Sequence, residues 1–206
     1  MAYFPAFIEI ENHPVLVVGG GRTALKKIEV LLEFKADITV IASEFIEEIQ
    51  KMDSQLVKRL EKPFQVSDVE GMHIVVAATE SKEVNHVIAE VCRERKILVN
   101  AIDQASDCTF IFPSYIKQGE VVAAFSSGGK SPVVTQYLKE KNRPIVTLGL
   151  AELTERLGSL RDMAKECIAT EKMRKAFYQE VLALGLEEER VPDEKEIEEI
   201  FSKYMD

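Results

Sequence analysis

The sequence has few of the residues that build disulfide frameworks or metal sites. Its only cysteines are Cys92, Cys108 and Cys167, which form no C-x-x-C pair, and its three histidines form no H-x-H or H-E-x-x-H arrangement. We therefore expect reduced thiols, as in the cytoplasm, and no metal ligands. No cysteine or serine stands in a context that indicates an activating base, so nucleophilic catalysis is not predicted either.

Long apolar runs and positive charge are also scarce. No stretch approaches the roughly 20 residues that span a bilayer, and residues 1–5 lack the basic start of a secretory signal. The net charge of −9 argues against nonspecific nucleic-acid binding. Residues 186–206 alone hold nine acids and three bases, so an anionic ligand can still bind where bases cluster elsewhere. The sequence thus predicts a cytoplasmic protein that binds neither a membrane nor nucleic acid.

Four short apolar runs have the continuous, β-branched character of parallel strands that are buried on both faces: Val15–Val18, Ile38–Ile41, Ile74–Ala78 and Ile97–Ala101. Helical patterns lie between them, at Ala24–Phe34 and Val84–Arg95. Strands that alternate with helices predict right-handed βαβ units. We therefore expect an α/β fold with a Rossmann-like, doubly wound parallel sheet over about residues 1–113.

The pattern changes after Pro113. A hairpin is predicted between Tyr115 and Phe125, and a polar turn then leads to Pro132, which suits the first position of a helix. We assign residues 114–146 to a dimerisation region and residues 147–206 to a C-terminal helical domain. Within that domain, Gly185 is expected to end one helix and Pro192 to begin the last.

An apolar stripe at helical spacing runs from Leu150 to Cys167 and resumes from Met173 to Leu184. It has two interpretations, an intramolecular core or a subunit interface. Because a hairpin and a few helices have little core of their own, we expect residues 114–185 to join two copies of the chain in a homodimer.

The segment Gly19-Gly20-Gly21-Arg22-Thr23-Ala24 matches the dinucleotide fingerprint G-x-G-x-x-A. It stands between a predicted strand and a predicted helix, where small residues allow a tight turn and the close approach of a pyrophosphate. The N-terminus of the helix adds unpaired N–H groups. We therefore predict that this loop binds the phosphates of a dinucleotide.

The acidic residue that usually contacts the ribose of such a cofactor is absent from the end of the second predicted strand. The sequence there ends Ala42-Ser43-Glu44, so Ser43 or Glu44 is the candidate to replace it. Residues 36–50 contain no Lys or Arg that would meet a 2′-phosphate. This loop favours NAD over NADP.

Polar residues also follow the later strands, at Thr79, Asn100 and Asp103, where parallel strands share a ligand-binding crevice. Thr79 and Asn100 are candidates to contact the cofactor, with a helix cap or a turn as the alternative, which is favoured for Thr79. Asp103 is the only carboxylate in residues 97–106 and precedes no helical pattern. We expect it to be catalytic, the alternative being an aspartate that holds the Gln104–Asp107 turn.

Taken in order, these motifs resemble those of the siroheme synthase N-terminal family, the precorrin-2 dehydrogenases with or without sirohydrochlorin ferrochelatase activity. The matching segments lie within residues 1–140 and are Phe4-Pro5-Ala6-Phe7, Val17–Gly21 with Ala24 and Lys27, Ala77-Ala78-Thr79 with Asn85, Asn100–Asp103, Phe110–Ser114 and Ser126–Pro132.

The resemblance implies an NAD-dependent oxidation of precorrin-2 to sirohydrochlorin, on the route to siroheme and in some members cobalamin, by a homodimer. It assigns the catalytic acidic position to Asp103. The candidate cofactor-binding residues are then Gly19, Gly21, Arg22, Thr23, Ser43, Glu44, Thr79 and Asn100. The substrate carries many carboxylates, and the candidates to bind it are Ser127, Gly128 and Lys130, of which Lys130 supplies a cation.

Other functions remain open at the level of sequence. Fused family members carry a methyltransferase domain that is not recognised here, so methylation is not expected, and no feature decides whether the protein also inserts a metal ion. One alternative is a nonenzymatic NAD-responsive module whose helices bind a partner, and another is a reductase for a different small substrate. The module does not account for Asp103 and the Ser126–Pro132 segment at the spacing of the family, and the reductase keeps the enzyme class without the tetrapyrrole.

Overall fold

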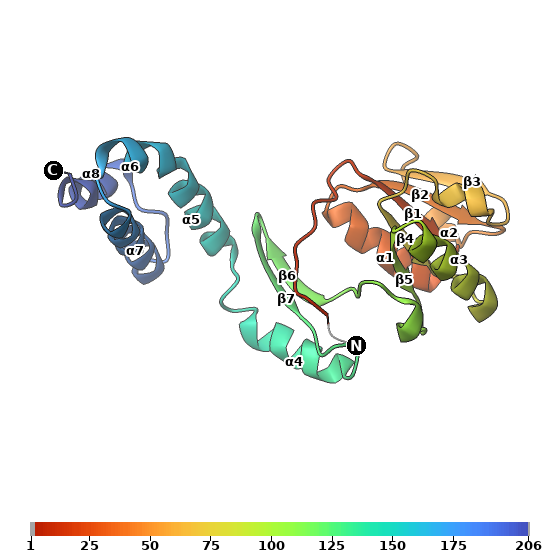
Figure 1. The fold of residues 1–206 in the computed structure, drawn as a ribbon. Coiled ribbons are helices and arrows are strands. Elements are labelled where there is room, and N and C mark those ends of the chain that lie inside the picture. The colour runs from red at the N-terminus through yellow and green to blue at the C-terminus, as the bar shows by residue number, and fades with distance from the viewer. Residues whose placement is uncertain (1–2, 206) are drawn as a thin grey trace. The chain divides into compact units, whose positions relative to one another are not determined.

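The structure, a computed structural model, describes residues 3–205. It divides the chain into two compact units, of which the first ends at Phe112 and the second begins at Pro113 (Figure 1). The finer predicted boundary between residues 146 and 147 stays a prediction. The predicted outer limits of the domains, residues 1 and 206, lie outside the described residues. So do the first two residues of the N-terminal segment that is expected to lack a secretory signal.

The first unit contains a five-stranded parallel sheet in the order β3-β2-β1-β4-β5. Its strands are β1 (Pro14–Val18), β2 (Asp37–Ala42), β3 (Val57–Glu61), β4 (Ile74–Ala77) and β5 (Leu98–Ala101). Val17 in the central strand lies opposite Val40 of β2 and Val76 of β4. All four predicted strands are therefore present, each within a residue or two of its expected bounds.

Helices cover both faces of this sheet (Figure 1). On one face, α1 (Arg22–Glu33) and the short α2 (Glu47–Gln50) bury Ile28 and Ile49 against β1 and β2. On the other face, α3 (Lys82–Glu94) and the 3-10 turn η1 (Val66–Val69) bury Ile88 and Val69. The predicted doubly wound α/β architecture is confirmed, and burial on both faces explains why its central strands are continuous apolar runs.

Strand β3 was not predicted, because its sequence does not look like a buried strand. It reads Val57-Lys58-Arg59-Leu60-Glu61, and only Val57 is fully buried. The strand lies at the edge of the sheet and pairs with β2 alone, so one side of it needs no apolar neighbour.

The second unit begins with the predicted hairpin, formed by β6 (Ser114–Gln118) and β7 (Val121–Phe125) in antiparallel register. Five helices follow: α4 (Pro132–Asn142), α5 (Leu148–Ser159), α6 (Arg161–Cys167), α7 (Glu171–Glu187) and α8 (Glu194–Ser202). Pro132 stands in the first turn of α4, as expected.

The apolar stripe of α5–α7 serves as a core within the chain. Phe177 and Val181 of α7 are completely buried and pack with Ala164 of α6 and with Ile197 and Phe201 of α8. Phe177 makes an edge contact with Phe201 at 5.4 Å between ring centres. The intramolecular interpretation therefore accounts for this part of the stripe.

Two expected helix boundaries are wrong. Gly185 does not end its helix, because α7 continues to Glu187. A Cβ at Gly185 would lie 2.8 Å from the side chain of Leu153, so this glycine allows α5 and α7 to approach closely. Pro192 does not begin α8 either. The helix starts at Glu194, after Asp193, whose side chain accepts a hydrogen bond from the N–H of Glu196.

The three cysteines are unpaired, with Cys92 and Cys108 buried and Cys167 exposed. Within residues 3–205, no helix is long and apolar enough to cross a membrane.

Candidate functional site

The glycine loop that follows β1 is packed tightly against the neighbouring strand ends. Gly19 has φ +134°, a conformation that favours glycine, and a Cβ there would lie 2.2 Å from the carbonyl oxygen of Ala78. A Cβ at Gly20 would lie 2.0 Å from the carbonyl oxygen of Glu44. The N–H of Ile46 also donates to the Gly20 carbonyl at 2.9 Å. These two glycines therefore fix the loop against the ends of β4 and β2.

Gly21 differs from both, because a Cβ at this position would have no atom within 4 Å. It is the N-cap residue of α1, and no side chain accepts a hydrogen bond from the first turn of that helix. The other helices of at least eight residues in the described chain each have such a cap, provided by Ser81, Ser131, Thr147, Thr170 and Asp193. The first turn of α1, which begins with Arg22 and Thr23, therefore has no side-chain cap.

An uncapped helix N-terminus beside an open glycine is the arrangement that binds a phosphate, because N–H groups and the helix dipole both favour a negative charge. Arg22 adds an exposed cation, 3.9 Å from the carboxylate of Glu48. The residues present therefore fit the pyrophosphate of a dinucleotide.

The end of β2 lies directly beside this loop, through the contact between Gly20 and Glu44. Ser43 and Glu44 are both exposed there, so either side chain is accessible to a ligand. Lys62 lies beside the end of β2, because its backbone N–H donates to the Ala42 carbonyl at 3.0 Å. Its ammonium group already pairs with Asp68 at 2.5 Å.

Thr79 holds a turn, which was the favoured alternative for this residue. Its hydroxyl lies 2.7 Å from Oδ1 of Asn85 and 3.0 Å from the carbonyl of Ser81, and its N–H donates to the same Asn85 oxygen. The buried Asn85 amide returns a hydrogen bond to the Thr79 carbonyl. The pair connects the end of β4 to the start of α3, so the hydroxyl, the N–H and the carbonyl of Thr79 all have structural partners.

Asn100 also has structural bonds, although it lies on β5 near the crevice. Its Nδ2 donates to the carbonyl of Phe110 at 3.1 Å and approaches the sulfur of Cys108 at 3.5 Å. The thiol of Cys108 in turn lies 3.2 Å from the Ala101 carbonyl, and burial raises its pKa. These bonds hold Cys108 and Phe110, which follow Asp103 in the sequence, against strand β5.

Asp103 follows β5 in the left-handed region, with φ +59°. Aspartate tolerates this conformation better than most residues. The preceding residue, Ile102, donates to the Ala77 carbonyl of β4, so Asp103 lies at the carboxyl edge of the sheet. The side chain is exposed and has no hydrogen bond or ion pair with any residue from 3 to 205.

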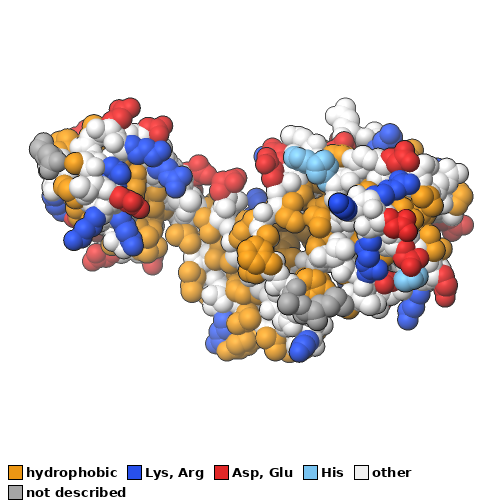
Figure 2. All heavy atoms as spheres, viewed as in Figure 1, with side chains coloured by type: hydrophobic (Ala, Val, Ile, Leu, Met, Phe, Trp, Pro, Cys, Tyr) orange, Lys and Arg blue, Asp and Glu red, His pale blue; other side chains and the backbone are white. Residues whose placement is uncertain are grey.

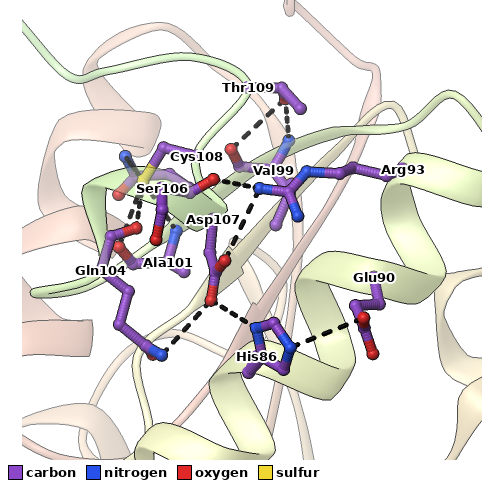
Figure 3. A network of polar contacts seen from close by, with 11 residues as sticks. His86, Glu90, Arg93, Val99, Ala101, Gln104, Ser106, Asp107, Cys108 and Thr109 are labelled. Atoms are coloured by element: carbon purple, nitrogen blue, oxygen red, sulfur yellow. Dashed lines mark hydrogen bonds and ion pairs between the residues drawn. The ribbon is translucent and has the colours of Figure 1, made fainter. Parts of the chain in front are cut away.

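A different aspartate holds the turn after Asp103. The side chain of Asp107 is only 7% exposed and is contacted by His86, Arg93 and Gln104 (Figure 3). The expected alternative role for Asp103, as the residue that ties down residues 104–107, thus belongs to Asp107. Sequence reasoning missed this cluster, since His86 and Asp107 are 21 residues apart and no local pattern joins them.

Lys27 is a second residue whose surroundings the sequence did not indicate. Its ammonium group lies 4.0 Å from the centre of the Phe112 ring, a cation–π contact. Burial lowers the pKa of Lys27. No carboxylate of the described residues pairs with it, so it is a half-buried cation without a counter-ion.

The candidate substrate-binding segment lies in the second unit, between β7 and α4. The Ser127 hydroxyl accepts from the N–H of Ser131 at 2.9 Å and donates to the Ser131 carbonyl, which closes the loop. Gly128 and Gly129 have φ +63° and +79°, values that favour glycine. Lys130 is exposed and makes no side-chain bond with the described residues. Its cation is therefore available to an anionic ligand.

One pocket in the described chain lies away from this site. It opens at the amino ends of β4 and β5, next to His73 and Arg95, which is the sheet edge opposite the glycine loop. No group of three or more His, Cys, Asp or Glu side chains among residues 3–205 has an arrangement suited to a metal ion.

Comparisons with known proteins agree with the geometry of the first unit. Residues 6–114, more than half of the chain, match a family model described as "Putative NAD(P)-binding". The chain is 36% identical to a siroheme synthase of Psychromonas ingrahamii over 187 residues, which are 90% of this chain and 40% of that protein. It is 34% identical to siroheme synthase 1 of Pectobacterium atrosepticum over 180 residues, 87% of this chain and 38% of that one. This chain belongs to the siroheme synthase N-terminal family.

Membership of the siroheme synthase N-terminal family gives the first unit its role as an NAD(P)-binding domain. The chain spans about two fifths of the length of the curated relatives named above. The fold of both units is shared with a solved structure titled "SirC, precorrin-2 dehydrogenase", with a TM-score of 0.73 and 22% identity over 98% of each chain. The predicted order of sheet, hairpin and C-terminal helices is thus confirmed.

Proposed function

We propose that this protein oxidises precorrin-2 to sirohydrochlorin with NAD as the hydride acceptor. The observation that carries the proposal is the exposed Asp103 carboxylate, which has no partner among the described residues and follows β5 at the same sheet edge as the glycine loop. A carboxylate that no structural bond occupies is free to act on a ligand. Similarity to siroheme synthases and to a precorrin-2 dehydrogenase supports the choice of substrate.

The oxidation removes a hydride and a proton from the macrocycle. NAD, when bound, takes the hydride. We assign the proton to a carboxylate oxygen of Asp103, which the left-handed turn holds at the end of β5. An ionised carboxylate beside the ring also favours the positive charge that develops as the hydride leaves.

The cofactor would be held by the first turn of α1 and by the end of β2. The N–H groups of Arg22 and Thr23 would contact the pyrophosphate, with Gly21 leaving room for it. Ser43 or Glu44 would accept hydrogen bonds from ribose hydroxyls. Ala78 and Thr79, against which Gly19 packs, form the neighbouring wall.

NAD rather than NADP is the proposed cofactor because residues 36–50, around the end of β2, contain no Lys or Arg. Lys62, whose backbone bonds to Ala42 at that end, pairs with Asp68. The exposed Glu44 carboxylate would also repel a 2′-phosphate. The parent kcat/KM should therefore be higher with NAD than with NADP, and an equal or higher value with NADP would contradict this preference.

The substrate's carboxylates require cations, and the proposed contacts are Lys130 with Ser127 and Gly128 of the same loop.

We also propose that the protein acts as a homodimer. Helix α4 supports this, because none of its residues is buried and apolar side chains lie on its surface (Figure 2). The free thiols agree with a cytoplasmic setting.

The direct test is anaerobic incubation of the chain with precorrin-2 and NAD, followed by absorption spectroscopy for sirohydrochlorin and NADH. Formation of both in equal amounts is expected. NAD binding without turnover would favour a nonenzymatic module, and turnover of another substrate only would favour a different reductase. Addition of ferrous or cobalt ion to the product then measures metal insertion separately.

A further inference from the structure

The turn that carries Asp103 is stabilised by side chains from a different element, α3. After Asp103, the chain forms the 3-10 turn η2 (Ala105–Asp107), which directs the Asp107 carboxylate inward. Within the turn, Nε2 of Gln104 donates to Oδ2 of Asp107 at 3.3 Å. The remaining partners of Asp107 lie on α3, so the position of the turn depends on that helix.

Two residues of α3 hold η2 from the same face of the helix (Figure 3). Nδ1 of His86 lies 2.8 Å from Oδ2 of Asp107 and must be the donor, because a carboxylate only accepts. Arg93 lies seven residues further on, and its guanidinium is 3.6 Å from Oδ1 of Asp107. Arg93 also donates to the carbonyl of Ser106. Both carboxylate oxygens and one backbone carbonyl of the turn are therefore bonded.

The charges around His86 favour its protonated form. Asp107 faces Nδ1 from η2, and Glu90 lies 3.5 Å from Nε2, one helical turn along α3. Arg93 is the opposing charge, on the same helix. The hydrogen bond and the charge of Asp107 together raise the pKa of His86 above its ordinary value of 6.5. The charged His86–Asp107 pair is thus fully formed below that value and weakens as the pH rises through the raised pKa.

No side chain of this cluster bonds to the carboxylate of Asp103, which immediately precedes Gln104 and the η2 turn. Asp103 has a φ of +59°, and the fixed residues after it help to hold that conformation. We propose that His86 is a positioning residue that acts through Asp107, holding the turn that aims the Asp103 carboxylate at the ligand. This inference rests on the proposed function, in which Asp103 receives a proton.

The test compares three variants of the full chain. His86→Ala removes the donor, whereas His86→Asn keeps an N–H near the position of Nδ1 but cannot titrate. His73→Asn is the matched control, since His73 lies at the amino end of β4, beside His13 and far along the strand from Asp103. The measurements are kcat with precorrin-2, the Kd for NAD, and hydrogen exchange of the backbone amides of residues 103–108.

For His86→Ala, kcat should fall about tenfold or more with an unchanged Kd for NAD, because a small displacement of a catalytic group is costly. His86→Asn should recover most of this loss, and His73→Asn should match the parent. The ratio of parent kcat to His86→Asn kcat should be greatest below pH 6.5 and should approach one as His86 loses its proton. A parental kcat in His86→Ala, or a pH-independent ratio, would overturn the proposal.

Failure of the proposed function is recognised separately. If the parent itself does not oxidise precorrin-2, the exchange measurement decides the positioning role without a substrate. Faster exchange of residues 103–108 in His86→Ala, but not in His86→Asn or His73→Asn, would support control of the turn by His86. Equal exchange in all variants would refute it.

Discussion

Gly20 lies so close to Glu44 that the two residues leave no room for a side chain between the glycine loop and the end of β2. The missing Cβ of Gly20 would lie 2.0 Å from the backbone oxygen of Glu44 and 2.9 Å from the Cβ of Ala42. Because the main obstacle is backbone, it cannot rotate away. The proposed pyrophosphate and ribose sites are thereby held at a fixed distance from each other.

Gly20→Ala should therefore destabilise the protein by about 1–3 kcal/mol or more, the cost of forcing atoms into a packed site. Urea unfolding measures this. Gly21→Ala is the matched control, since a Cβ there meets nothing within 4 Å. Its cost should stay below about 1 kcal/mol, the scale of a changed N-cap. Equal stability of the two variants would contradict the packing argument.

Gly21→Asp should fold normally yet lose NAD binding. The open space at Gly21 accepts the side chain, but its carboxylate would meet the pyrophosphate, and such like-charge contacts cost several kcal/mol. The Kd for NAD, measured by calorimetry, should rise by about a hundredfold or more. Gly21→Ala, which adds a methyl group but no charge, should bind NAD more tightly than Gly21→Asp. If Gly21→Asp bound NAD like the parent, α1 would not be the phosphate site.

Asp103→Asn should preserve the fold, because asparagine also tolerates the left-handed conformation and the Asp103 carboxylate has no bond with the described residues to lose. If the carboxylate accepts the proton, kcat with precorrin-2 should fall about 10²-fold or more, with the NAD Kd unchanged. Steady-state rates measure kcat, and stopped-flow mixing of the same preparation with NAD measures the Kd. Turnover near that of the parent would remove Asp103 from the mechanism.

Tyr137→Glu should break the proposed homodimer. Val133 and Tyr137 stand one helical turn apart on α4 and are 78% and 59% exposed. A charge buried at an interface without a partner is strongly unfavourable. Sedimentation should give twice 23.2 kDa for the parent and 23.2 kDa for the variant. Leu56→Glu, a change at a 59% exposed residue of the first unit, should leave the dimer intact. A monomeric parent would exclude the dimer.

The central strands and the glycine loop could be predicted because local sequence determines them. Val15–Val18 is apolar on both faces of the sheet, and the glycine triplet follows it directly. The candidate residues of the first unit come from the ends of different strands, and the parallel order of the strands brings those ends to one edge. The order of motifs along the chain therefore sufficed to propose residues 19–24, 43–44 and 103 as parts of one site, and their roles stay predictions.

The parts that were missed depend on partners distant in the sequence. His86 looks like an ordinary surface residue of α3 until η2 brings Asp107 to 2.8 Å. Gly185 resembles a helix end until its close approach to Leu153 is known. Equally, the stripe from Leu150 onward could not be assigned to core or interface before α8 was seen to cover it.

The charged sequence of strand β3 bears on edge-to-edge aggregation of the sheet. The other edge of the sheet is protected by the chain itself, because Thr109 exchanges hydrogen bonds with Val99 of β5. Among the described residues, no strand pairs with the outer side of β3, yet its exposed Lys58 and Glu61 oppose pairing with a strand of another chain. The charges that keep β3 from being recognised as an apolar run therefore also disfavour edge-to-edge aggregation.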